Sequence, residues 1–461
     1  MLTRVALFIV LFAAALSAQQ LSDPQLSEVR SVLRSASALV PMVEESQRPS
    51  VAANIAVYQV RAGDVEGALL TTTALASSGD PGLAIDSVAA TLAAHGDQDL
   101  ALKLVDTSPK ENTKATAYLE MALALAQKKK FDLAVETANR IPDTQFPAWV
   151  DATMRVYLME YQAGEKDSAA SLLQSVVTRV KAAQDNPAIP TTIRPSLFVT
   201  IVNNLAQSGN SDAAWPIVEE LRALAEEATD PQQRDSLFYY LAVVETQLGA
   251  YGAAQEAIDR LPLGNLHDGA VEVLAGVRTQ KGDPDAALEQ LSNQPNEFLR
   301  LTTIRSVADE RAEQGNYAGA LAVIESIQRP GDRAYAFAEL ALEQAQHEDP
   351  TTAYTNELAW ETARENPDQT APYVFGFIAE TRAIVGDYSG SMNMMPDLAD
   401  EWRPHALLTL TSQMSGTGHT GDAYALADAQ THPYSKAYAL LGIAAGTLYQ
   451  IDQQDKQPST P

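Results

Sequence analysis

The chain has 461 residues, with 32 Lys and Arg against 59 Asp and Glu, so that its formal net charge is −27, and it contains no Cys. This acidic balance argues against binding of a nucleic-acid backbone, which needs basic surface. The lack of Cys excludes thiol catalysis, zinc–thiolate sites and a lipidated cysteine after a leader. The acidity fits either a strongly solvated exterior or a basic partner, and both explanations stay open.

Residues 1–18 have the pattern of a secretory signal peptide. Arg4 supplies a positive start, residues 5–16 are apolar, and Ser17-Ala18 precede Gln19. The pattern predicts cleavage after Ala18, and the apolar run is shorter than the roughly 20 residues that span a bilayer. No later segment is apolar enough to cross a membrane. We therefore expect an exported, soluble protein in the periplasm or secreted.

Residues 19–48 are expected to form an N-terminal capping helix that starts at Asp23-Pro24. A Gly-centred turn then recurs along the chain. The interval is 33 residues from Gly63 to Gly96 and again from Gly282 to Gly315, and a period of this size is typical of stacked helical hairpins. The turns are Gly63-Asp64, Gly96-Asp97, Gly164-Glu165, Gly209-Asn210, Gly249, Gly282-Asp283, Gly315-Asn316 and Gly386-Asp387.

Each turn has the same neighbours. A bulky residue lies eight before it, a small residue seven before it, and Ala five after it, as in Val307, Ala308 and Ala320 around Gly315. These spacings place the apolar residues on one face of each helix, and Ala opposite a bulky residue lets two helices approach closely. Gly accepts the left-handed conformation that ends a helix, and the following Asp or Asn can cap the next helix.

This pattern resembles the tetratricopeptide repeat, most clearly between Phe298 and Ile327. The resemblance covers residues 49–450, or about eleven hairpins. The chain departs from the family pattern because the first-helix Trp and Tyr are mostly missing, the closing Pro is irregular, and Lys128 to Lys130 replace one turn Gly. The resemblance implies an all-α fold, a right-handed α-solenoid of antiparallel helical hairpins.

The spacing lengthens once, between Gly164 and Gly209. A long second helix up to Asp185 is followed by a Pro-containing segment, which suggests a junction between repeats 49–185 and repeats 186–450. Residues 451–461 are polar and are expected to be a disordered tail. A basic residue also recurs fifteen positions before the turn. We interpret it as holding the loop between repeats, and the alternative is a series of cations that binds an anionic ligand. The residues are Arg48, Arg194, Arg234, Arg300, Arg333 and Arg403.

No catalytic motif and no cofactor-binding motif is found, so the chain is not expected to be an enzyme. One group of residues suits Cu(I) chemistry: Met392, Met394 and Met395, with His405, His419 and His432 in the same region. Met395 also occupies an apolar core position nine after Gly386, where Met often fills gaps. No metal site is assigned.

The resemblance to tetratricopeptide repeats implies a ligand groove on the concave face. Side chains of the first helices would line this groove, namely those that lie thirteen, ten and six residues before each turn. Aromatic anchors and acidic groups mix there, which suits an extended peptide with some positive charge; the alternative is that these side chains only cover neighbouring helices. The expected ligand-binding residues are Met154, Asn203, Tyr239, Glu272, Arg305, Asp309, Tyr335, Tyr373 and Glu380.

The sequence thus favours a non-catalytic scaffold or adaptor of the bacterial cell envelope that binds a protein or peptide, without nucleic acid and without a membrane span after signal cleavage. Two alternatives remain. One is the helical platform of a peptidoglycan-related envelope enzyme, and the other is capture of a metal or small ligand by the C-terminal repeats. The oligomeric state is left open.

Overall fold

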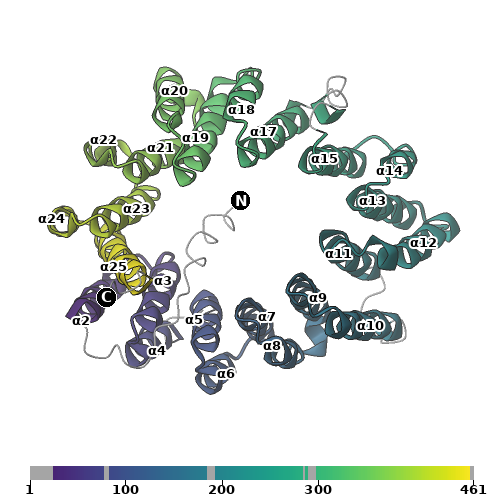
Figure 1. Cartoon of the computed structure of the whole chain (residues 1–461), viewed down its shortest axis with the longest axis horizontal. Coiled ribbons are helices and arrows are strands. Elements are labelled where there is room, and N and C mark those ends of the chain that lie inside the picture. Colours follow the sequence, from purple (N-terminus) through teal and green to yellow (C-terminus); the bar gives the residue numbers. More distant parts are fainter. Residues whose placement is uncertain (1–23, 77–81, 184–192, 284–285, 289–296, 457–461) are drawn as a thin grey trace, which may run out of the picture. The chain divides into compact units, whose positions relative to one another are not determined.

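A computed structural model describes residues 24–76, 82–183, 193–283, 286–288 and 297–456. Within these ranges the only regular secondary structure is helical, as the sequence predicted (Figure 1). The expected signal peptide and residues 457–461 lie outside the described residues. None of the described helices combines the length and the apolar character that a membrane crossing requires.

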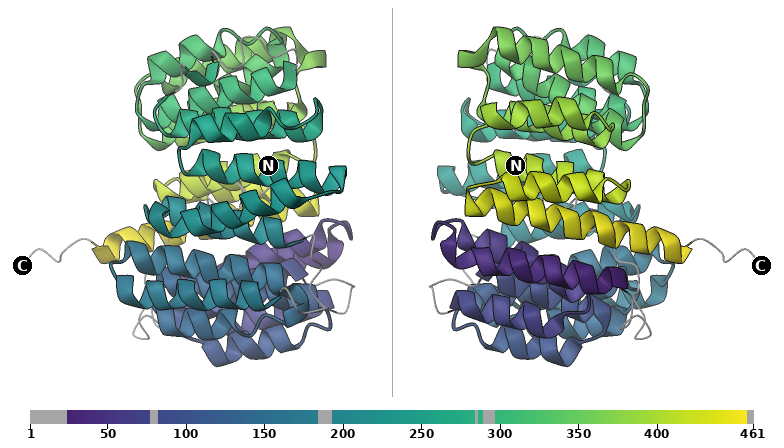
Figure 2. Two further views of the ribbon diagram at one scale, coloured as in Figure 1. Left: turned by 90° about the vertical axis from the view of Figure 1, so that its right-hand side faces the viewer. Right: turned by 90° about the vertical axis from the view of Figure 1, so that its left-hand side faces the viewer.

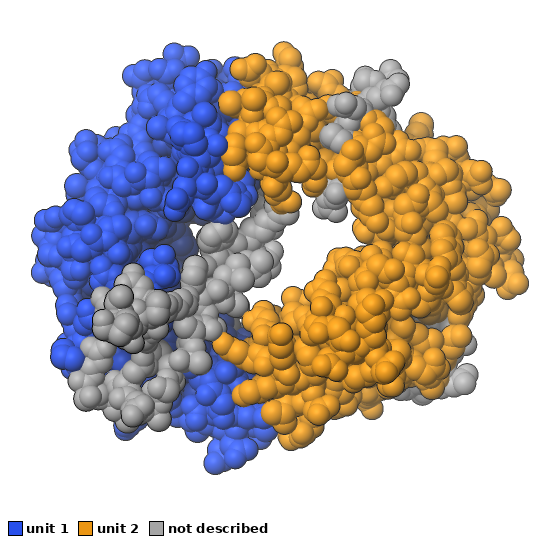
Figure 3. Space-filling model, in the orientation of Figure 1, with its two compact units in different colours: residues 1–108, 329–461 blue, residues 109–328 orange. Residues whose placement is uncertain are grey.

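The chain forms two compact units, coloured separately in Figure 3. Unit 1 consists of residues 1–108 together with 329–461, and unit 2 consists of residues 109–328. The division therefore falls near residues 108 and 328, and not at 185, where the lengthened spacing suggested a junction. Residues 184–192 of that segment lie outside the described residues.

Unit 2 is a series of hairpins in which each first helix packs against the next first helix (Figure 1). Each first helix except α15 also packs against a described second helix of its own. The first helices are α7 (Glu111–Gln127), α9 (Phe146–Gln162), α11 (Arg194–Gln207), α13 (Pro231–Gln247), α15 (Asn265–Gln280) and α17 (Glu297–Glu313). The second helices are α8 (Phe131–Ala138), α10 (Lys166–Ala182), α12 (Ser211–Glu227), α14 (Tyr251–Ile258) and α18 (Tyr317–Ile324).

Unit 1 repeats this arrangement and adds one N-terminal helix, α2 (Pro24–Leu39). Its first helices are α3 (Arg48–Arg61), α5 (Gly82–His95), α19 (Pro330–Gln346), α21 (Pro372–Ile384), α23 (Arg403–Gly416) and α25 (Pro433–Lys456). Its second helices are α4 (Val65–Ala76), α6 (Gln98–Asp106), α20 (Thr352–Glu365), α22 (Tyr388–Met394) and α24 (Thr420–Ala429). Because α25 continues to Lys456 and buries Ile451 and Asp452, residues 451–456 are helix and not the tail that the sequence predicted.

The turn inside each hairpin has one hydrogen-bond pattern. At the first, Gly63 N donates to Val60 O at 2.9 Å and Asp64 N donates to Gln59 O at 2.7 Å. This pair of bonds closes a helix whose next residue is left-handed, and Gly63 has φ 71°. The same pair recurs at eleven turns of the described residues, which confirms the expected number of hairpins.

Two of these turns use residues other than Gly. Lys129, inside the predicted substitute turn, has φ 57°, and Glu348 has φ 53°.

The small residues around the turns are the buried contacts between paired helices. Ala56 and Ala68, before and after the first turn, are both 0% exposed, so the close approach expected from the sequence is confirmed.

Helices α23 and α25 of unit 1 approach each other closely. A Cβ on Gly442 would lie 2.3 Å from Leu408 O, and one on Gly446 would lie 2.1 Å from Ser412 O. The Thr411 hydroxyl donates to Ala439 O across the same contact at 2.9 Å. Glycine at these two positions therefore lets the two backbones meet without side chains between them.

Helix α2 does more than cap the first hairpin. It packs along α25, the last helix described, and takes the place of a second helix for it (Figure 2, right). Four apolar residues on one stripe of α2 are buried: Leu26, Val29, Leu33 and Ala36. The N-terminal and C-terminal segments of unit 1 are thereby joined into one packed body.

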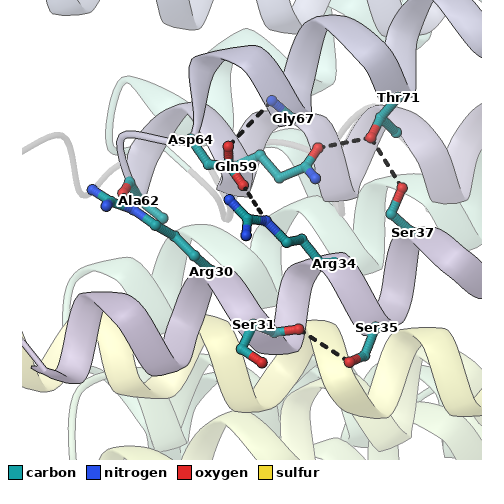
Figure 4. Close-up of polar contacts among 10 residues, drawn as sticks. All are labelled: Arg30, Ser31, Arg34, Ser35, Ser37, Gln59, Ala62, Asp64, Gly67 and Thr71. Carbon is teal, nitrogen blue, oxygen red and sulfur yellow. Dashed lines mark hydrogen bonds and ion pairs between the residues drawn. The ribbon is translucent and has the colours of Figure 1, made fainter.

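Polar contacts fix α2 against the first hairpin as well (Figure 4). Arg30 Nε donates to Ala62 O at 2.7 Å, and Arg34 Nε lies 3.1 Å from Oδ2 of the buried Asp64. Farther along, the hydroxyls of Ser37 and Thr71 are 3.1 Å apart. These contacts join α2 to the turn at Gly63 and to the second helix, α4, of the same hairpin.

Candidate binding faces

Each first helix presents one side to its second helix and has an opposite side that points away from that second helix. The buried positions seven, eight and eleven before the turn face the second helix, whereas positions thirteen and nine lie on the opposite side. We call this opposite side the binding face of each unit. In unit 1 it carries a series of rings that we call the aromatic row: Tyr335, Tyr373, Phe377, Trp402, His405 and Tyr438.

The aromatic row begins between α19 and α21. The ring of Tyr335 meets that of Tyr373 edge-on, with centroids 5.1 Å apart, and stacks on Phe377 at 6.0 Å. Tyr373 in turn contacts Trp402, at the start of α23, at 5.7 Å. Tyr373, Phe377 and Trp402 are half-buried, so part of their ring surface is accessible, whereas Tyr335 and Tyr438 are buried at 9% and 1% exposed.

The row continues across the α23–α25 contact. His405 lies 6.3 Å from Trp402 and 5.1 Å from Tyr438, measured between ring centroids. The hydroxyl of Tyr438 accepts a hydrogen bond from Asn54 Nδ2 on α3 at 3.3 Å, and Ser50 Oγ is 3.5 Å away. Burial lowers the pKa of His405, so its imidazole is neutral at pH 7. In this state it contributes an uncharged aromatic ring to the row.

Glu380 lies one turn after Phe377 on α21. Its side chain is half-buried, and among the described residues it forms no hydrogen bond and no ion pair. Burial raises the pKa of Glu380 to about 7. A carboxyl group left without a counter-charge in a half-buried position is a typical mark of a functional site.

The binding face of unit 2 has a different chemistry. Tyr239 on α13 extends over α15, where its ring lies 3.4 Å from the position that a Cβ on Gly269 would take. Burial, and then Tyr240 and Glu272, raise the pKa of the Tyr239 hydroxyl. The Tyr239 and Tyr240 rings are 5.5 Å apart. Tyr239 and Glu272, both expected in the site, are therefore neighbours on adjacent first helices.

Carboxylates also gather on α7 and α9 of unit 2. Asp151 Oδ2 lies 3.8 Å from Arg155 Nη1, and Glu120 on α7 interacts with both of these residues. Desolvation raises the pKa of Glu120 and of Asp151, against the opposing effect of Arg155. The group thus has two carboxyl groups for one guanidinium.

The other expected site residues have mixed outcomes. Met154 is 0% exposed and is no part of a binding face, because it lies beside the buried Thr153 and one turn before the buried Tyr157 on α9. Asn203 is half-buried, with its Oδ1 unpaired in the described structure. Arg305 and Asp309 are half-buried one turn apart on α17, and each interacts with other described residues.

Sequence reasoning missed Phe377, Trp402, His405 and Tyr438. Two of them follow from the register that gave Tyr335 and Tyr373, thirteen before the turn. His405 is thirteen before Gly418, and Tyr438 is two after Lys436, as Tyr335 is two after Arg333. Extending that register into the last units would have found half of the missed residues.

The recurring basic residues hold loops. Arg48 Nε donates to Val43 O at 2.7 Å, and Arg403 donates to Met395 O at 2.8 Å and Leu398 O at 2.7 Å. Both arginines satisfy backbone carbonyls of the connection before their own helix. These two contacts support the structural interpretation, and the side chain of Arg194 lies outside the described residues.

The C-terminal Met and His residues do not form an obvious metal site. Met394 and Met395 are core residues, at 4% and 6% exposed, and Met392 is 37% exposed. His419 packs against the ring of Tyr388 at 5.5 Å. Within the described ranges, no group of three or more His, Asp and Glu side chains is arranged to hold a metal ion.

No protein-family model matches the sequence, and no curated protein sequence matches it. The solved structures that match this chain include the following three. Ton1535 from Thermococcus onnurineus NA1 is 13% identical, with 77% of this chain and 97% of that chain aligned at a TM-score of 0.30. The maize pentatricopeptide repeat protein PPR10 is 15% identical, with 96% of this chain and 66% of that chain aligned at a TM-score of 0.34. A circular tandem repeat protein is 10% identical, with 94% of this chain and 98% of that chain aligned at a TM-score of 0.18.

Proposed function

We propose that this protein is a non-catalytic scaffold that binds an extended protein segment or peptide through the binding faces of its first helices. The observation that carries the proposal is the aromatic row of unit 1. Its rings come from successive helices, so one ligand crossing α19, α21 and α23 would meet several of them. Tyr and Trp are the residue types that most often dominate the binding energy of protein interfaces.

The charge of the binding faces favours a basic ligand. Glu380 in unit 1 and the Glu120–Asp151 group in unit 2 supply carboxylates, and the whole chain has a net charge of −27. Complementary charge speeds association and disfavours acidic partners. Together with the secretory pattern of residues 1–18, this supports a periplasmic adaptor of the cell envelope.

The proposal is tested by measuring peptide binding to the chain that begins at Gln19. Fluorescence anisotropy would compare labelled twelve-residue peptides of basic, neutral and acidic composition, each with and without aromatic residues. We expect basic peptides to bind, and the double variant Tyr373→Ala with Phe377→Ala to weaken binding by about tenfold or more, as loss of interface hot spots does.

Tyr354→Ala is the matched control, because Tyr354 is 62% exposed on the second helix α20 of the same unit. This variant should bind like the wild type. Circular dichroism would show that both variants keep their helices. Equal binding by all three proteins, or no binding of any peptide, would rule out the aromatic row as the ligand site.

A further inference from the structure

We propose that Glu380 and the rings of Tyr335, Tyr373 and Phe377 form a subsite for one cationic side chain, a Lys or Arg of the bound peptide. The inference rests on the proposed function and adds a chemical requirement to it. An aromatic surface alone would accept any apolar ligand. A carboxylate beside the rings would select a positive charge.

The geometry starts from one stripe of α21. Tyr373, Phe377 and Glu380 are separated by four and three residues, so their side chains leave the same side of the helix. Tyr335 reaches this stripe from α19, stacking on Phe377 with an interplanar angle of 25° and meeting Tyr373 edge-on at 84°. The subsite therefore offers the half-buried rings of Tyr373 and Phe377, supported from α19 by the buried ring of Tyr335. The Glu380 carboxyl group lies one turn beyond.

The protein supplies no cation of its own to Glu380 within the described residues. The nearest basic residue in α21 is Arg382, which is turned toward α20. Its guanidinium pairs with Glu357 at 3.2 Å and lies 5.6 Å from the centroid of the Trp360 ring. The described residues thus leave Glu380 without a counter-charge, and a bound cation would supply it.

The neighbouring titratable groups do not substitute for that cation. Glu339 on α19, one turn after Tyr335, is another half-buried carboxylate. Tyr335 and Tyr373 carry no positive charge in either protonation state of the phenol. His405, farther along the row, has a pKa lowered by burial. A Lys or Arg placed over the rings would gain a cation–π contact as well as the carboxylate.

Ligand binding should release protons from this site. Burial raises the pKa of Glu380 to about 7, so a substantial fraction of the free protein holds a proton there at pH 7. A cation bound beside the carboxylate lowers its pKa and expels that proton. An apolar ligand in the same place would exclude water further and would retain the proton.

Isothermal titration calorimetry distinguishes these outcomes. The probes are an acetylated and amidated octapeptide of alternating Gly and Lys, and the same peptide with norleucine, the uncharged analogue, in place of each Lys. Titrations at pH 7 in two buffers with different ionisation enthalpies give the number of protons released. We expect the Lys peptide to bind at least about tenfold more tightly than its analogue, as a charge-assisted contact implies, with net proton release.

Glu380→Gln should abolish most of this preference and most of the proton release, while Glu361→Gln, the matched control at an exposed position of α20, should change neither. Thermal unfolding would show that Glu380→Gln folds, since glutamine mimics the protonated carboxyl group. If the Lys and norleucine peptides bind the wild type equally through the aromatic row, the cationic subsite is wrong and the scaffold proposal stands. If Tyr373→Ala with Phe377→Ala also has no effect, or neither peptide binds, both proposals fail.

Discussion

The hydroxyl of Tyr424 on α24 donates a 3.0 Å hydrogen bond to Oε1 of Glu28 on α2, joining residues that are 396 apart in the sequence. Burial and this bond to a carboxylate raise the pKa of Tyr424 well above its usual range. With the packing of α2 along α25, the contact makes unit 1 a body assembled from both chain segments. The N-terminal hairpins therefore gain the support of α25 only after residues 433–456 have been synthesised.

Leu33→Ala tests the stabilising role of α2. Leu33 is 0% exposed, and removing its side chain should lower the free energy of unfolding by about 2–5 kcal/mol, because a cavity adds to the lost burial. Urea unfolding followed by circular dichroism measures the change. Leu70→Ala is the control, since Leu70 is 64% exposed on α4 and should cost no more than about 0.5 kcal/mol. Equal effects would mean that α2 is not packed as described.

Gly446→Ala tests the close contact of α23 with α25. The new methyl group would lie 2.1 Å from Ser412 O, so the helices must separate, and overpacking of this kind costs about 1–3 kcal/mol. Thermal unfolding monitors the loss. Gly421→Ala in α24 has open space around it and should not destabilise the protein. A Gly446→Ala protein as stable as the wild type would contradict the close approach.

The hairpins could be predicted from the sequence because their determinants are local. A left-handed residue at Gly63, a buried Ala five residues later and a bulky residue eight before all fall within one repeat. The pairing of α2 with α25 has no such signal. The stripe of Leu26, Val29 and Leu33 shows that α2 buries one face, but nothing in the local pattern says which helix covers that face.

The binding faces were predictable only in part, because a register gives the side of a helix and not the depth of a side chain. Position ten before the turn is the half-buried Tyr239 in α13 but the fully buried Met154 in α9. The ring of Tyr239 extends outward over Gly269, whereas the flexible Met154 turns into the core beside Tyr157. Such differences depend on the neighbouring helix and not on the repeat.

Lys129→Gly tests the substitute turn between α7 and α8. Lys129 has φ 57°, a conformation that Gly adopts without the steric cost borne by other residues. The variant should be more stable than the wild type by about 0.5–1 kcal/mol, the cost of a left-handed residue being partly offset by the entropy of Gly. Gly164→Ala, at φ 95°, should have the opposite sign in the same denaturation experiment. If Lys129→Gly lost stability, Lys129 would be contributing contacts that outweigh its backbone strain.

Glu245 in unit 2 should make stability depend on pH. Its side chain is 0% exposed, with Oε1 2.5 Å from Arg222 Nη2, and burial raises its pKa from 4.5 to about 7 despite Arg222. Between those two values the folded protein binds more protons than the unfolded chain, so stability falls as the pH rises through this window and levels off above it. In the wild type, the free energy of unfolding should therefore fall between pH 5 and pH 8. Urea unfolding at these two pH values should show that Glu245→Gln makes this fall smaller by about 1–3 kcal/mol. Glu227→Gln, which alters an exposed carboxylate at the end of α12, should keep the wild-type slope, and an unchanged slope in Glu245→Gln would show that Glu245 is already ionised at pH 5.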